Sequence, residues 1–110
     1  MLYGGALYCN RTTESVTAHI GAWEENWLTR DLLWMMFDFP FNQLGVKRIF
    51  GQVNETNTHA LTFDRKLGFR EVARIDGVYD HGAACIVLRM DREDCRFLNL
   101  KPRRYGRNVH

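Results

Sequence analysis

The sequence predicts an α/β domain in which a mixed sheet carries helices on its faces. Short apolar stretches with the two-residue alternation of strands are separated by two stretches in which apolar residues recur at helical spacing. An N-terminal hairpin comes first, and the order is then strand–helix–strand–helix–strand–strand. Strands that alternate with helices in this way are typical of a mixed sheet with packed helices.

The first 22 residues predict an antiparallel hairpin. Leu2–Cys9 is apolar and aromatic, with the paired glycines Gly4 and Gly5 as the place for a bulge. Asn10–Ser15 is polar and forms the turn. In Val16–Ala22 apolar and polar residues alternate, which indicates the second strand.

A helix is predicted from Thr29, a plausible N-cap, to about Leu44. Its buried stripe consists of Leu32, Leu33, Met36 and Phe37. Pro40 lies inside this pattern, and because proline has no N–H to donate, the regular part of the helix should end near Phe39. Gly45 closes the segment.

The second half of the chain predicts three further strands and one short helix. Asn57 is a favourable N-cap and Gly68 suits a left-handed C-cap, so a helix is expected between them. The strands are expected at Val46–Val53, Phe69–Ile75 and Ala83–Met90, with a turn at Asp76-Gly77.

Length, charge and cysteines restrict the class of protein. A chain of 110 residues fits one domain, expected at 1–97, followed by a basic tail at 98–110. The net charge of +2 does not favour binding to nucleic acid or to a membrane, and the tail is most simply a solvated end. Three widely spaced cysteines form neither a metal motif nor a disulfide framework, which favours a reducing cytoplasm.

The segment Asn57–Phe69 has a specific pattern: Asn, Ala three residues later, an apolar residue next, and Lys-x-Gly-Phe at the end. This pattern resembles a signature of the GNAT superfamily of acetyl-CoA-dependent N-acetyltransferases. Leu44–Ile49 resembles the ribosomal-protein-acetylating branch of that family, and Leu88–Arg96 resembles the closing strand of phage-encoded relatives. The resemblance covers roughly residues 15–97.

The resemblance implies that acetyl-CoA is the co-substrate and binds where two parallel strands, here Val16–Ala22 and Ile49–Val53, splay apart. The cofactor-binding residues it implies are Ile20, Gly21, Asn26, Trp27, Leu28, Thr29, Asn57 and Phe63. The pyrophosphate would rest at the start of the first helix. Ordinary structural roles remain open for several of these residues: Asn57 as a helix cap, Phe63 as a core aromatic, and Trp27 as a core or interface side chain.

The chain also departs from the family pattern. Glu24 and Glu25 place negative charge in the loop where the family has glycines, and Asp64 occupies the position of its usual Tyr acid. An ionised Asp cannot donate a proton to the departing thiolate, so that acid is expected to be absent.

Acyl transfer to an amine also needs a base, because an ammonium must lose a proton before it attacks the thioester. Glu14 and His19 are candidates for this base, and Tyr79 is a candidate to replace the missing acid. Each also fits a plain surface or turn role.

The chain begins directly on a strand, without the strand and two helices that usually precede the hairpin in this family. We therefore expect a shortened member whose exposed apolar surface favours a homodimer. An acetyltransferase acting on an amine of a protein or small molecule is one hypothesis. A catalytically silent binding protein, such as a viral accessory protein, is the alternative, and nucleic-acid binding through the tail is a third.

Overall fold

The computed structural model describes residues 2–3, 6–20 and 30–99. These residues form a six-stranded mixed sheet in the order β1-β2-β3-β4-β6-β5. The strands are β1 (Leu2–Tyr3), β2 (Ala6–Cys9), β3 (Ser15–Ile20), β4 (Arg48–Asn54), β5 (Arg70–Ile75) and β6 (Cys85–Asp91). The helices are α1 (Arg30–Asp38) and α2 (Thr58–Leu67), with short helical turns at Phe39–Gln43, Asp80–Gly82, Arg92–Asp94 and Arg96–Asn99. The α/β prediction is confirmed.

The N-terminal hairpin of β2 and β3 is confirmed, with Tyr8 opposite Ala18. The bulge expected at Gly4-Gly5 lies outside the described residues. The predicted strand Leu2–Cys9 is divided into β1 and β2, which pair antiparallel, Leu2 with Leu7 and Tyr3 with Ala6.

The first helix changes character at Pro40, as its lack of an N–H predicts. The α-helix ends at Asp38, and the turn Phe39–Gln43 is a π-helix in which the Leu44 N–H donates to the Phe39 carbonyl at 2.9 Å. Pro40 leaves the Met36 carbonyl without its helical donor. The hydroxyl of Tyr8 donates to that carbonyl instead, which fixes α1 to the hairpin.

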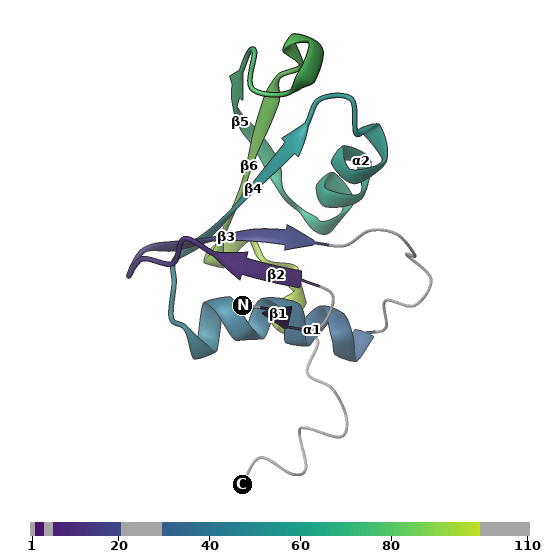
Figure 1. The fold of residues 1–110 in the computed structure, drawn as a ribbon. Helices are drawn as coiled ribbons and strands as arrows, with labels where there is room; N and C mark the ends of the chain where they lie inside the picture. The colour runs from purple at the N-terminus through teal and green to yellow at the C-terminus, as the bar shows by residue number, and fades with distance from the viewer. Residues whose placement is uncertain (1, 4–5, 21–29, 100–110) are drawn as a thin grey trace, which may run out of the picture.

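Both helices cover the same face of the sheet. The β3–α1–β4 and β4–α2–β5 crossovers progress in the same direction across it, and since such connections are right-handed they place their helices on one side. Phe37 of α1 stacks on Phe97 with 5.0 Å between ring centroids, and it also contacts Phe69 at the end of α2. One core therefore joins α1, α2 and the last helical turn (Figure 1).

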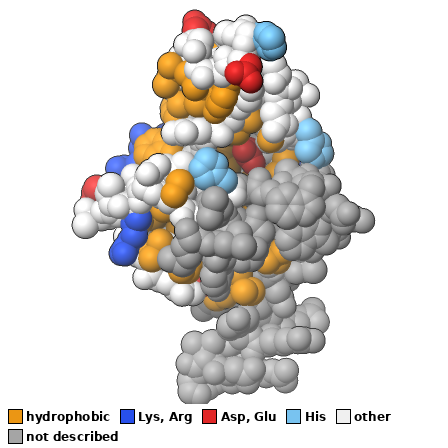
Figure 2. Space-filling view, viewed as in Figure 1, with side chains coloured by type: hydrophobic (Ala, Val, Ile, Leu, Met, Phe, Trp, Pro, Cys, Tyr) orange, Lys and Arg blue, Asp and Glu red, His pale blue; other side chains and the backbone are white. Residues whose placement is uncertain are grey.

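The opposite face of the sheet is not covered by described residues. Along β4, Ile49, Gly51 and Val53 are buried, whereas Gln52 is exposed and Phe50 only half-buried. Every residue of the edge strand β5 is exposed. Exposed hydrophobic side chains gather at the β5–β6 end of the molecule, visible at the top of Figure 2, and include Val72, Ile75 and Val78.

The predicted caps of α2 are both present. The Asn57 side chain accepts a hydrogen bond from the Ala60 N–H at 3.1 Å, and Gly68 has a left-handed φ of 114°. We expect Asn57→Ala to lower the free energy of unfolding by about 1 kcal/mol, because one amide of the first turn loses its acceptor. Urea denaturation measures this loss, and Thr62→Ala, at an exposed position of the same helix, is the control. An unchanged midpoint for Asn57→Ala would contradict the capping role.

Candidate functional site

The site lies where β3 and β4 separate. The two strands pair in parallel over only three positions, Ser15 with Arg48, Val16 with Ile49 and Thr17 with Phe50. Beyond Thr17 and Phe50 the strands diverge, as Figure 1 shows for the ends of β3 and β4. The splayed pair expected from the sequence is therefore present.

The divergence is a stable feature of the sheet and not a frayed edge. β3 stays paired with β2 as far as Ile20, and β4 stays paired with β6 as far as Asn54. Each strand therefore keeps its outer partner, while its inner edge, between Ala18–Ile20 and Gly51–Asn54, has no partner strand among the described residues. Unpaired strand edges are suited to hydrogen bonding with an extended amide-bearing chain.

A pocket of about 160 Å³ occupies this gap. It is lined by Ala18, His19, Gly51, Gln52, Val53, Asn54, Asn57, Ala60 and Asp64. Its volume lies below the roughly 300–1,000 Å³ of sites that enclose a whole drug-sized ligand. The pocket suits a narrow group inserted between the strands.

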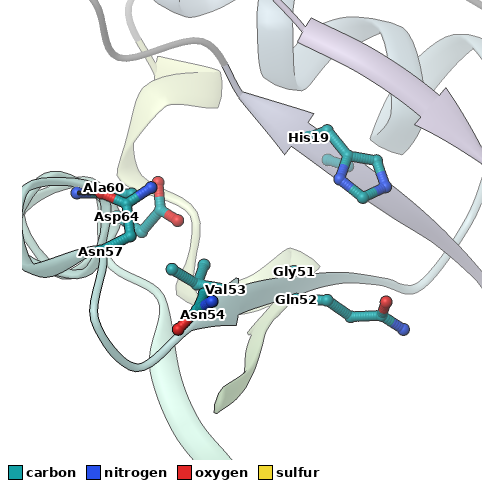
Figure 3. A pocket seen from close by; sticks show the side chains of 9 residues that line it. His19, Gly51, Gln52, Val53, Asn54, Asn57, Ala60 and Asp64 are labelled. Atoms are coloured by element: carbon teal, nitrogen blue, oxygen red, sulfur yellow. Dashed lines mark hydrogen bonds between the residues drawn. The ribbon is translucent and has the colours of Figure 1, made fainter. Parts of the chain in front are cut away.

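Helix α2 forms one wall of the pocket. Asn57, Ala60 and Asp64 follow one another at spacings of three and four residues, so they lie on one face of the helix, as Figure 3 shows. The Asn57 Oδ1 is occupied by the cap, which leaves its amide nitrogen for a ligand. Burial raises the pKa of Asp64 to about 6. Asp64 therefore loses its proton near pH 6: at pH 7 it is mostly ionised, as the sequence suggested, but it keeps a neutral fraction that an ordinary aspartate lacks.

Strands β3 and β4 form the opposite side. His19 and Gln52 are exposed and belong to the strands, across the gap from Asp64, and the Gln52 side chain extends away from Asp64 (Figure 3). His19 follows the buried Ala18, and strand alternation turns it off the core face. The pocket thus has a helix side with a partly buried carboxyl and a strand side with a solvent-accessible imidazole.

Of the residues predicted for the site, the structure brings together His19 and Asn57. Ile20 ends β3 at the edge of the gap. Glu14 does not line the pocket: it precedes β3 at the other end of the strand, where its carboxylate lies 3.2 Å from the Lys47 ammonium. Phe63 is buried in the core and does not line the pocket.

Tyr79 also lies outside the pocket lining. It is half-buried in the β5–β6 turn, and its side-chain hydrogen bond with Cys85 raises the pKa of the phenol. The expected cofactor residues Gly21, Asn26, Trp27, Leu28 and Thr29 lie outside the described residues.

Sequence reasoning placed Gly51 and Gln52 in the site only as part of the splayed strand Ile49–Val53, did not name Asn54 or Ala60 as site residues, and discounted Asp64. The helix spacing from Asn57 would have identified Ala60 and Asp64. No local signal identifies Gly51, because its role depends on the point at which two distant strands stop pairing.

Among the described residues, none of the helices combines the length and apolar character of a membrane span. No protein-family model matches the sequence, and no curated protein sequence matches it. Solved structures, however, match its fold. An acetyltransferase of the GNAT family from Bacillus anthracis superposes with a TM-score of 0.64 at 10% identity, over 80% of this chain and 57% of that one.

Two further structures are similar. The N-acetyltransferase PseH of Campylobacter jejuni in complex with acetyl coenzyme A matches with a TM-score of 0.56 at 18% identity, over 77% of this chain and 56% of that one. A variant of the spermidine N-acetyltransferase SpeG from Vibrio cholerae matches with a TM-score of 0.62 at 18% identity, over 79% of this chain and 53% of that one. The chain thus spans little more than half the length of these proteins. Over that span, it has the fold of the GNAT acetyltransferases.

Proposed function

We propose that this chain is an acetyl-CoA-dependent N-acetyltransferase that transfers the acetyl group to an amine by direct attack. The divergence of β3 and β4 after three parallel pairs is the observation that carries the proposal. It opens unpaired backbone beside the N-terminus of α2, which suits the amide-bearing pantetheine arm. The similarity to a fold in which PseH was solved with acetyl coenzyme A supports the same assignment.

The two sides of the pocket suggest separate entrances for the two substrates. Asn57 and Ala60 would contact the pantetheine arm from the helix side. The amine would then approach from the strand side, where His19 is exposed and could accept its proton. Holding both reactants in one gap supplies much of the acceleration in such a transfer.

We expect saturable binding of acetyl-CoA by calorimetry, and release of free CoA thiol when an amine is added. Spermidine is a suitable first amine, because it is the substrate named for SpeG, and a peptide with a free N-terminus tests a protein acceptor. Heat-denatured protein is the control. No binding at millimolar acetyl-CoA would contradict the proposal.

The uncovered sheet face and the exposed Val72, Ile75 and Val78 favour a second candidate, a GNAT-like protein that acts through protein contact. It predicts a complex that forms equally well with and without acetyl-CoA. The same surface supports the proposed homodimer, and a monomer mass by light scattering would contradict that assembly. The ribosomal-protein branch, a phage origin and a cytoplasmic location remain proposals from sequence resemblance and cysteine usage.

A further inference from the structure

The carboxyl of Asp64 is placed in the pocket without a structural task. Its Oδ1 is buried and has no hydrogen-bond partner among the described residues. A buried polar atom without a partner costs about 1–3 kcal/mol, so such groups are rare outside functional sites. The fold does not need this carboxyl, because α2 is capped by Asn57 and anchored by Leu61, Phe63 and Leu67.

Three charged groups on the elements around Asp64 have partners of their own. Arg65 of α2 lies 3.3 Å from Glu71 of β5, and Glu55, after β4, pairs with Arg74 at 2.8 Å. Arg96 donates to the Leu67 carbonyl at the far end of α2.

Across the gap, the titratable side chain that lines the pocket with Asp64 is His19 of β3. With no described cation against the carboxylate, burial alone raises the pKa of Asp64 to about 6. By that value roughly a tenth of the molecules carry the neutral acid at pH 7.

Among the described residues on the helix side of the pocket, Asp64 is also the one side chain that can give up an acidic proton. Among the nine lining residues, the titratable side chains are His19 and Asp64, and the others are amides, glycine or aliphatic. His19 belongs to the opposite, solvent-exposed side. Tyr79 does not line the pocket and bonds to Cys85.

We propose that Asp64 is the proton donor to the departing CoA sulfur, an inference that rests on the proposed acetyl transfer. The amine nitrogen forms a C–N bond with the thioester carbonyl carbon, and the nitrogen gives up its proton to His19 or water. The C–S bond then breaks with its electron pair on sulfur. The Asp64 carboxyl transfers its proton to that sulfur, which leaves CoA as the thiol, and the carboxylate regains a proton from solvent.

The test compares the native chain with Asp64→Asn, which keeps the shape of the side chain but carries no acidic proton. We expect the acetyl-CoA dissociation constant to change less than about threefold and the rate of thiol release to spermidine or the acceptor peptide to fall about 100-fold. Asp64→Glu should recover part of the rate. Glu93→Gln, an exposed carboxyl outside the pocket, is the matched control and should leave both quantities unchanged.

A second readout follows the proton without turnover. Bound pantetheine would displace water from Asp64 and raise its pKa further, so binding of acetyl-CoA at pH 7 should take up a fraction of a proton. Calorimetry in buffers of different ionisation enthalpy measures this uptake, and Asp64→Asn should abolish it.

The outcomes separate this inference from the proposed function. If the native chain neither binds acetyl-CoA nor releases thiol, both fail together. If it binds and turns over while Asp64→Asn keeps its rate and its proton uptake, Asp64 is not the donor and the proposed function stands.

Discussion

Replacement of Gly51 by valine is expected to weaken the binding of acetyl-CoA at least about tenfold while the domain still folds. Gly51 is buried, lines the pocket, and stands one residue beyond the last β3–β4 pair. A Cβ built there would lie 3.9 Å from the Ala18 carbonyl oxygen, across the gap. The two further methyl groups of valine would then occupy space that the proposed pantetheine arm requires.

Gly51→Ala is the matched control, because its Cβ makes only ordinary contacts, the nearest at 3.8 Å to Leu88. We expect the Gly51→Ala variant to bind acetyl-CoA nearly as tightly as the native chain does. The Gly51→Val variant should raise the dissociation constant tenfold or more, which corresponds to about 1.4 kcal/mol. Calorimetry measures the affinity, and circular dichroism checks the fold. Equal affinity for Gly51→Val and Gly51→Ala would show that acetyl-CoA does not enter between the strands.

The features that the sequence predicted well are those encoded locally. The helix between Asn57 and Gly68 was correct at both ends because a cap depends on a few neighbouring residues. Pro40 likewise determined where the first helix loses its regular hydrogen bonds. Strand boundaries moved by one or two residues, as at Arg48–Asn54 in place of Val46–Val53, because strands are delimited by their partners.

The features that escaped prediction depend on distant pairing. Glu14 just precedes the predicted strand to which His19 belongs, yet of the two only His19 lines the pocket. The reason is the register with β4, which places the divergence of the strands after Thr17. The raised pKa of Asp64 was not predicted, for a related reason. An aspartate is ordinarily ionised, and only tertiary burial beside the gap raises its pKa.

The arrangement of both helices on one face was also not predicted, since the sequence suggested helices on the faces of the sheet. It follows from the strand order, in which β4 lies beyond β3 and β5 lies beyond β4, so that both crossovers progress in the same direction. With both helices on one side, the face that carries Phe50 and Gln52 is open in the described residues, next to the strand side of the pocket.

Because the core lies on one side of the sheet, two aromatic residues should differ greatly in how much each contributes to the free energy of unfolding. Phe37 is 1% exposed and joins α1 to Phe97 and Phe69, whereas Phe50 lies half-buried on the uncovered face. Phe37→Ala removes a ring from the centre of the core, and we expect it to lower the free energy of unfolding by about 3–5 kcal/mol. That is a large part of the 5–15 kcal/mol typical of whole domains.

Phe50→Ala deletes the same ring from the other side of the sheet and should cost about 1 kcal/mol, the usual loss for a partly exposed position. Urea denaturation of both variants measures the difference, and light scattering on each sample tests whether Phe50 is covered by a second copy. If the protein is monomeric and Phe50→Ala lowers the free energy of unfolding as much as Phe37→Ala does, a one-sided core is contradicted. The same loss accompanied by dissociation of a dimer would instead assign the uncovered face to the subunit interface, beside the entrance proposed for the amine.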